Sequence, residues 1–126
     1  IDREKYEYLQ RVSDVKIHNY CGALSVRESI ALYSMVDLVV TVDSAPAHLA
    51  AYAKTPNLVV IYGPTNNWQW KPFVTQTNLK QIYLDLPCRP CFTRYCNNKK
   101  CLKNLKPALV KQALDEIISR EKNLVL

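Results

Sequence analysis

The centre of the chain carries the sequence Leu38-Val39-Val40-Thr41-Val42-Asp43-Ser44-Ala45-Pro46-Ala47-His48-Leu49-Ala50. Its first five residues form a continuous, largely β-branched run, which predicts a strand buried on both faces. The residues that follow predict a turn, and Pro46 suits the first position of a helix that continues over 48–53. A second apolar run over 58–62 predicts another buried strand. The unit is therefore strand, helix, strand, with short connections.

The flanking segments extend this unit in both directions. Apolar spacing predicts a helix in the first dozen residues, and Val15-Lys16-Ile17 predicts a short strand. Ser25-Val26-Arg27-Glu28 has the pattern of a capping box and predicts a helix that begins there. A last short strand is expected at 82–84, and a C-terminal helix at about 107–120. This alternation predicts an α/β fold with a Rossmann-like parallel sheet.

Length and composition indicate one globular domain over residues 1–126. The chain weighs 14.5 kDa, with 48% hydrophobic and 22% charged residues, which is ordinary for a folded chain and excludes a disordered one. No apolar stretch reaches the roughly 20 residues of a membrane-spanning helix. With two glycines, the chain has neither a GxGxxG motif nor a Walker motif.

The net charge of +6 belongs entirely to a basic, cysteine-rich insert at residues 88–106. This insert has six basic residues and no acidic one, whereas the segments on either side are neutral. Four of the five cysteines lie in it, with the spacing Cys88-x2-Cys91-x4-Cys96-x4-Cys101. The spacing is compatible with a structural zinc site and with one or two disulfides. With Phe92, Tyr95 and its basic residues, the insert could also be a nucleic-acid-binding zinc knuckle, although it lacks the usual glycines.

The turn after the first buried strand is the strongest candidate for a ligand site. Ligands of parallel sheets bind beyond the carboxyl ends of strands, where a helix N-terminus offers N–H groups to a phosphate. Asp43 could orient the turn or contact a ligand hydroxyl, and His48 could donate to a phosphate oxygen. The alternative is an ordinary Ser/Asp helix cap with a core-facing histidine. A hydrolase triad is disfavoured because the GxSxG elbow is absent.

Three motifs form a series along the chain: Cys21-Gly22-Ala23-Leu24-Ser25-Val26-Arg27-Glu28, the run from Val36 to Ala50, and Ile61-Tyr62-Gly63-Pro64-Thr65. In order and spacing they resemble glycosyltransferase family 9, the family of the ADP-heptose:lipopolysaccharide heptosyltransferases. The family pattern runs roughly G-x-x-S-L-x-E, A-D-L-x-V-x-x-D-S/T-G-x-x-H-x-A, then F-G-P-T. A cysteine run before the final helix is similar to that of many members.

The resemblance implies a GT-B architecture with the active site between two Rossmann-like domains, this chain being most or all of the C-terminal, donor-binding one. It assigns the donor diphosphate to the turn formed by Asp43, Ser44, Ala45, Pro46 and His48. It places the nucleobase near Leu24 and Ser25. The usual glycine of the turn is Ala45 here, and a methyl group is tolerated there only if φ is negative.

The resemblance further implies an inverting glycosyltransferase that moves a sugar, heptose, from a nucleotide-diphosphate donor, ADP-heptose, to lipopolysaccharide core or a related glycan. The catalytic base is expected in an N-terminal domain outside this chain, so the chain alone is expected to be inactive. Its start at Ile1, without Met, fits an excised piece. We expect no required cofactor, no nucleic-acid partner, and a cytoplasmic location at the bacterial inner membrane. A zinc-knuckle-like module and a ligand-free α/β interaction domain remain as alternatives.

Overall fold

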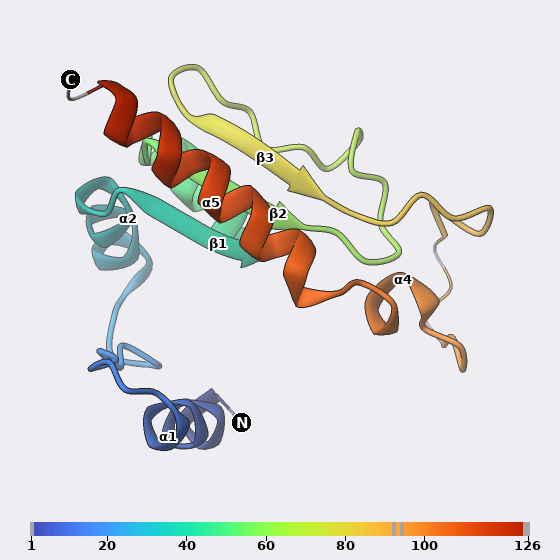
Figure 1. The fold of residues 1–126 in the computed structure, drawn as a ribbon, viewed down its shortest axis with the longest axis horizontal. Coiled ribbons are helices and arrows are strands. Elements are labelled where there is room, and N and C mark those ends of the chain that lie inside the picture. The colour runs from blue at the N-terminus through green and yellow to red at the C-terminus, as the bar shows by residue number, and fades with distance from the viewer. Residues whose placement is uncertain (1, 92, 94, 125–126) are drawn as a thin grey trace.

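The computed structural model describes residues 2–91, 93 and 95–124 of the chain, and its core is a three-layer α/β sandwich (Figure 1). Its elements, in chain order, are α1 (Asp2–Val12), α2 (Val26–Met35), β1 (Leu38–Val42), α3 (Ala45–Tyr52), β2 (Asn57–Ile61), β3 (Asn78–Ile82), α4 (Lys100–Lys103) and α5 (Pro107–Leu124). The predicted α/β class with a parallel sheet is thereby confirmed. No helix of the described chain is both long enough and apolar enough to cross a bilayer.

The sheet has three parallel strands in the order β1-β2-β3. β2 lies in the middle, and its first four residues are buried. Its β-branched and leucine side chains suit a strand covered on both faces. In the register, Val42 of β1 and Ile82 of β3 both pair with Ile61. The carboxyl ends of all three strands therefore meet at one edge of the sheet.

The two faces of the sheet form separate hydrophobic cores. The α2 and α3 face is centred on the buried side chains of Val39, Ala47, Ala50, Ala51, Leu58, Val60 and Tyr62. The α5 face is centred on Val59, Ile82, Ala113 and Ile117. Small alanines on one side of α3 let that helix lie close to the strands. The helix that follows β1 is therefore packed closely against the sheet.

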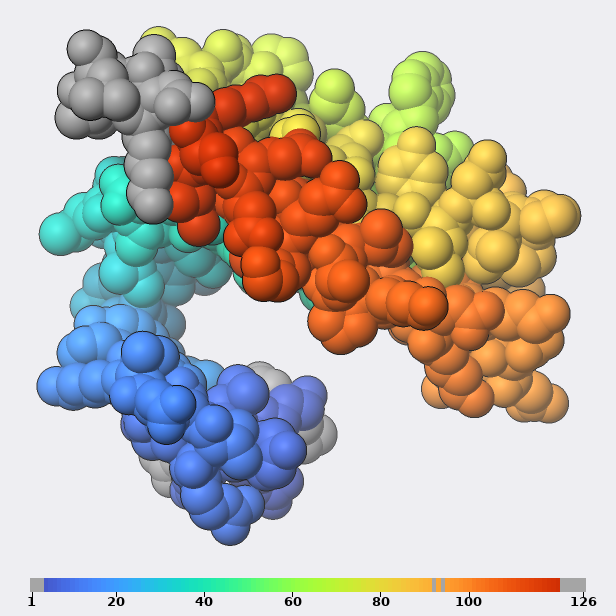
Figure 2. Space-filling view, in the orientation of Figure 1, coloured from blue at the N-terminus to red at the C-terminus, as the bar shows by residue number. Residues whose placement is uncertain are grey.

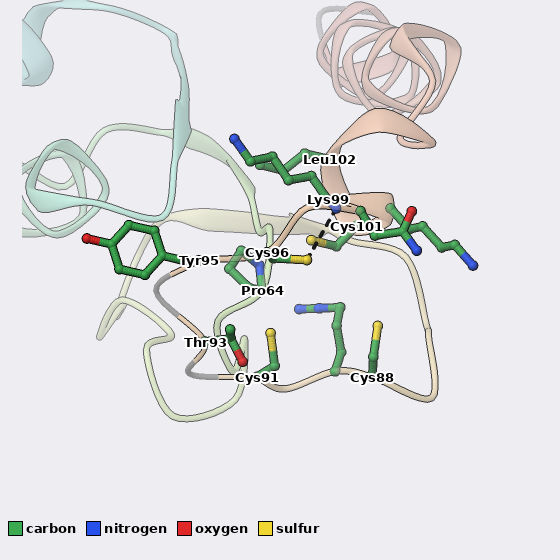
Figure 3. A pocket seen from close by; sticks show the side chains of 12 residues that line it. Pro64, Cys88, Cys91, Thr93, Tyr95, Cys96, Lys99, Cys101 and Leu102 are labelled. Atoms are coloured by element: carbon green, nitrogen blue, oxygen red, sulfur yellow. Dashed lines mark hydrogen bonds between the residues drawn. The ribbon is translucent and has the colours of Figure 1, made fainter.

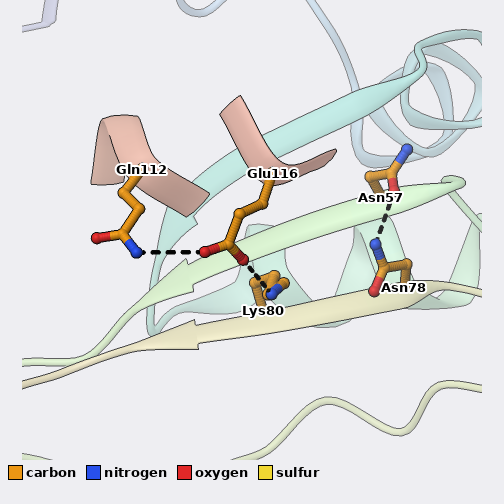
Figure 4. A network of polar contacts seen from close by, with 5 residues as sticks. All are labelled: Asn57, Asn78, Lys80, Gln112 and Glu116. Carbon is orange, nitrogen blue, oxygen red and sulfur yellow. Dashed lines mark hydrogen bonds and ion pairs between the residues drawn. The ribbon is translucent and has the colours of Figure 1, made fainter. Parts of the chain in front are cut away.

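Polar contacts hold the amino ends of the strands in register (Figure 4). Buried Asn57 donates from its side-chain amide to the carbonyl of Asp37 at 3.0 Å and accepts from Asn78 at 3.0 Å. On the α5 face, Lys80 of β3 forms an ion pair with Glu116 at 2.7 Å. Asn57 thus connects the starts of all three strands.

The structure corrects one prediction about β1. The strand has the predicted bounds, but it is not buried on both faces, because Val40 is 44% and Val42 56% exposed. β1 is an edge strand of the sheet, and α5 packs over β2 and β3 instead. On the α5 side of β1, Leu38 packs against the core, whereas Val40 and Val42 are exposed in the described chain.

The strand predicted at residues 15–17 is also wrong. This segment belongs to an arm that leads from α1 to α2 and stands apart from the sheet (Figure 2). The side chain of Gln10 accepts from the Ile17 amide at 2.9 Å and donates to the Val15 carbonyl at 3.3 Å. Because the end of α1 supplies these partners, the segment does not need a neighbouring strand.

The last strand lies earlier than predicted, at Asn78–Ile82 instead of 82–84. Its middle residues, Lys80 and Gln81, are polar and only partly buried. Such residues are tolerated at a sheet edge, and they conceal the strand from an argument that relies on apolar runs.

Candidate functional site

The turn between β1 and α3 lies at the carboxyl edge of the sheet, as predicted. The backbone amide of Asp43 donates to the carbonyl of Ile61 at 3.0 Å, which extends the pairing of β1 with β2 by one residue. α3 then begins at Ala45, two residues later than Asp43. The Asp43 side chain is half-buried, whereas those of Ser44 and His48 are exposed. The predicted turn residues are thus contiguous on one rigid junction.

The side chain of Ser44 does not cap α3. Ser44 occupies the N-cap position in an extended conformation, but its hydroxyl donates backward to the Val42 carbonyl at 3.3 Å. Pro46 has no N–H, and the Ala47 amide donates to the Ser44 carbonyl at 3.0 Å. Within the described chain, the Ser44 and Ala45 amides of this turn have no acceptor. These donors suit an anion at the helix start.

Ala45 adopts the backbone conformation that its side chain requires. It is the first residue of α3, and the described non-glycine residues with positive φ are Lys54 and Lys99, both elsewhere. Helical residues have negative φ, so the methyl group that replaces the family's usual glycine causes no backbone strain.

Tyr62 lies beside this turn at the end of β2, and the sequence did not single it out. Its side chain is fully buried, and its hydroxyl accepts from the Gln81 amide at 3.3 Å. Burial raises the pKa of Tyr62, the Gln81 hydrogen bond offsets part of the rise, and the nearby Asp43 carboxylate adds to it. The Asp43 charge at the end of β1 therefore affects the buried Tyr62 hydroxyl at the end of β2, where the dielectric constant is low. In the sequence, Tyr62 could have been noticed as the one residue of the apolar run 58–62 that carries a hydroxyl group.

The remaining predicted site residues lie on other elements. His48 is exposed on the first turn of α3, which rules out the core-facing interpretation. Leu24 is half-buried and Ser25 is exposed where the arm enters α2. Ser25 forms the predicted capping box, with its amide donating to Glu28 at 2.7 Å. No hydrogen bond joins Leu24 or Ser25 to the β1–α3 turn in the described part of the chain.

The loop after β2 forms the neighbouring part of the same edge. Gly63 is buried, and a Cβ placed on it would lie 3.0 Å from the Leu102 side chain, so a larger residue requires that side chain to move. Arg89 donates to the Leu84 carbonyl at 2.8 Å and to the Thr65 carbonyl at 2.9 Å. The Cys91 amide donates to the Pro64 carbonyl at 2.9 Å. The cysteine segment is thereby held against the end of β2.

A cavity of about 500 Å³ lies between this loop and α4 (Figure 3). Four thiols line it, and we name them the cysteine cluster: Cys88, Cys91, Cys96 and Cys101. All are free thiols, as is the exposed Cys21. Backbone N–H groups of Lys99 and Asn98 lower the pKa of the Cys96 thiol, and the nearby lysine charges add to this effect. Phe92 and Arg94, which contributed to the nucleic-acid alternative, lie outside the described residues.

The cysteine cluster does not surround a common point. In the part of the chain that the structure describes, no three His, Cys, Asp or Glu side chains are arranged to hold a metal ion. The cavity brings the four thiols to one space, and the same loop places that space beside the carboxyl end of β2.

Comparisons with known proteins agree with these features. The profile of glycosyltransferase family 9 (heptosyltransferase) matches residues 2–102. Lipooligosaccharide heptosyltransferase 2 of Campylobacter jejuni serotype O:2 is 35% identical over 124 residues, which cover 97% of this chain and 36% of that protein. Lipopolysaccharide heptosyltransferase 3 of Escherichia coli is 33% identical over 101 residues, which cover 77% of this chain and 28% of that protein. No solved structure gives a significant match.

The chain spans about a third of the length of the first of these relatives. The family profile covers most of the chain and includes all three sequence motifs, the β1–α3 turn and nearly all of the cysteine segment. The chain belongs to glycosyltransferase family 9, the heptosyltransferase family.

Proposed function

We propose that this chain is the donor-binding part of a GT-B glycosyltransferase that transfers heptose from ADP-heptose to lipopolysaccharide core or a related glycan. The observation that carries the proposal is the position of the β1–α3 turn in a chain of this family. The turn lies at the carboxyl end of a parallel strand and at a helix start, and its Ser44 and Ala45 amides have no acceptor among the described residues.

The role of the turn is to bind and stabilise the departing diphosphate. The Ser44 and Ala45 amides and the positive end of the α3 dipole would face the phosphate oxygens, and His48 would donate to one of them. Asp43 would orient the turn or accept from a ligand hydroxyl. In our proposal Leu24 and Ser25 lie near the nucleobase.

Inverting transfer also needs a base to activate the acceptor hydroxyl. We assign that base to a separate N-terminal domain, with which this chain would form the active site. On this assignment the chain by itself binds donor but does not transfer sugar. The basic residues of the 88–106 insert would attract phosphorylated acceptors and anionic headgroups at the inner membrane of a bacterium.

The test is a calorimetric titration of ADP, ADP-heptose and UDP into the purified protein and its Asp43→Ala variant. We expect the two ADP ligands to bind in preference to UDP and to lose about 10-fold or more in affinity in the variant, because a charge-assisted contact is removed. Asp85→Ala, an exposed aspartate outside the turn, is the matched control and should bind as the wild type does.

A short oligonucleotide provides the opposing measurement. Binding of the oligonucleotide alone, with a steep salt dependence, would favour the zinc-knuckle alternative and contradict the donor-binding function. Equal ADP affinity in the wild type and in Asp43→Ala would remove Asp43 from the site.

A further inference from the structure

The cysteine cluster has features that nucleotide binding does not explain. Its four members line one cavity, from Cys88 on the loop after β3 to Cys101 on α4 (Figure 3). We propose that the cysteine cluster binds one zinc-like transition-metal ion through four thiolates, and that this site joins the 88–101 loop to α4.

The chemistry of the cavity selects a thiophilic metal. Its lining contains four thiols and no carboxylate or imidazole. Hard cations such as Mg²⁺ and Ca²⁺ require oxygen ligands, whereas four sulfur ligands favour tetrahedral zinc or iron. The spacing x2, x4, x4 leaves enough chain between ligands for them to surround a single ion.

One of the four sulfur atoms already accepts a backbone hydrogen bond. The Lys99 amide donates to the Cys96 sulfur at 3.3 Å, which stabilises a thiolate in this turn. The turn requires Lys99 to adopt a left-handed conformation with φ of 47°, which is uncommon for a residue with a side chain. The same conformation occurs at Lys54, just after α3, so at Lys99 it fixes the path of the chain into α4. α4 begins directly afterwards and carries Cys101.

The surrounding charge has the sign that the site needs. Four thiolates and one divalent cation leave two negative charges, and residues 88–106 supply six basic side chains without an acidic one. Lys99, Lys100 and Lys103 are exposed on α4 or directly before it. These cations would offset the net charge of a filled site at short range.

The segment also has little else to order it. No helix or strand is described between the end of β3 and α4, and among the described residues the hydrogen bonds that join this segment to the loop after β2 are those of Arg89 and Cys91. A metal ion would add a cross-link at the point where the regular backbone hydrogen bonds end. Because the thiols do not yet surround a common point, we expect binding to contract the cavity.

The test measures metal and thiols in the purified protein, prepared without oxygen. We expect one zinc or iron ion per chain by elemental analysis. We also expect four thiols to be slow toward a thiol reagent until a strong chelator is added. Cobalt exchanged into the wild-type protein should give the intense charge-transfer absorption of a tetrathiolate site.

Two variants and a control locate the metal. Cys91→Ser and Cys101→Ser should each lose most of the bound metal, whereas Cys21→Ser, which removes a thiol far from the cavity in the sequence, should retain it. Disulfides found by mass spectrometry in the anaerobic protein would overturn the proposal. So would unchanged metal content in Cys91→Ser, or rapid reaction of all five thiols after zinc addition.

The cobalt spectrum uses the wild-type chain and therefore remains decisive if a variant fails to fold. The metal inference does not depend on the donor-binding function. A protein that holds metal but does not bind ADP would contradict only the donor-binding function. A protein that binds ADP but holds no metal would contradict only the metal inference.

Discussion

Arg89 is a single side chain that connects three segments of the molecule. Its guanidinium donates to carbonyls of Leu84 and Thr65 and lies 4.8 Å from the centre of the Tyr83 ring. A planar group with several fixed donors is needed to make these contacts together, and lysine cannot reproduce them. The residue is therefore a structural anchor of the loop, although its charge suggests a role in ligand binding.

We expect Arg89→Lys to lower the free energy of unfolding by about 1–3 kcal/mol, because two part-buried carbonyls lose their donor. Denaturant unfolding measures the change through the transition midpoint. Arg27→Lys, on the exposed surface of α2, is the control and should leave the midpoint nearly unchanged. Equal effects of the two substitutions would show that the fork of hydrogen bonds contributes nothing.

At the scale of elements, a capping box fixes the start of α2. The Ser25 amide donates to the Glu28 carboxylate at 2.7 Å, and the Glu28 amide donates to the Ser25 hydroxyl at 3.3 Å. The Ser25 hydroxyl beside the carboxylate, and then the Ser25 amide that donates to it, hold the pKa of Glu28 below its ordinary value of 4.5. A lowered folded-state pKa means that ionised Glu28 stabilises the fold above pH 4.5.

The consequence is a defined pH dependence. The stabilisation should be complete at neutral pH and disappear as the pH falls below 4.5 through the lowered pKa. Glu28→Gln keeps a hydrogen-bonding side chain but removes the charge, so it should be less stable than the wild type at pH 7. Thermal unfolding at a series of pH values should show the two proteins converging in acid. A constant difference across that range would contradict this account.

The elements that sequence reasoning predicted well are those whose local and tertiary preferences agree. β1, α3 and β2 combine β-branched runs with a proline-marked helix start, and the structure places each within three residues of its predicted bounds. The predicted position of β3 was wrong because Lys80 and Gln81 lie in an edge strand, and such a strand does not need an apolar sequence. Val15-Lys16-Ile17 has the pattern of a strand, but its amide and carbonyl groups bind Gln10 instead.

The candidate site also has features that could be predicted from the sequence and features that could not. The β1–α3 turn follows from the order of elements, so its position at the sheet edge could be predicted. The backward hydrogen bond of Ser44 could not, because several acceptors are within reach of a turn hydroxyl. The spacing of the four cysteines could not predict that they line one cavity, because the cavity depends on how Pro64 and α4 approach each other.

At the scale of the whole molecule, charge is distributed unevenly. The surplus of six positive charges lies in residues 88–106, next to the carboxyl edge of the sheet, while the rest of the chain is neutral. A concentrated patch produces a local field that screening reduces within about 10 Å at 0.1 M salt. Any attraction to anionic partners should therefore act through one end of the molecule.

We expect the protein to bind vesicles that contain anionic phospholipid, and to release them as salt is raised. Each lysine near the surface contributes about 1 kcal/mol, so replacing Lys99, Lys100 and Lys103 with Gln should weaken binding roughly 100-fold. Vesicle co-sedimentation measures this. A control variant carries Gln at Lys16, Lys54 and Lys71, which are exposed elsewhere. Equal binding by both variants would show that the total charge of the protein, and not the 88–106 insert, determines vesicle binding.

The tight approach of Gly63 to Leu102 has a consequence for how this protein can change over generations. A side chain at position 63 needs space that the end of the Leu102 side chain now fills, so a substitution at 63 requires Leu102 to move or to be replaced by a smaller residue. We expect substitutions at the two positions to arise as compensating pairs, a larger residue at 63 with a smaller one at 102. The size of the residue at position 63 should thus depend on the size of the residue at position 102.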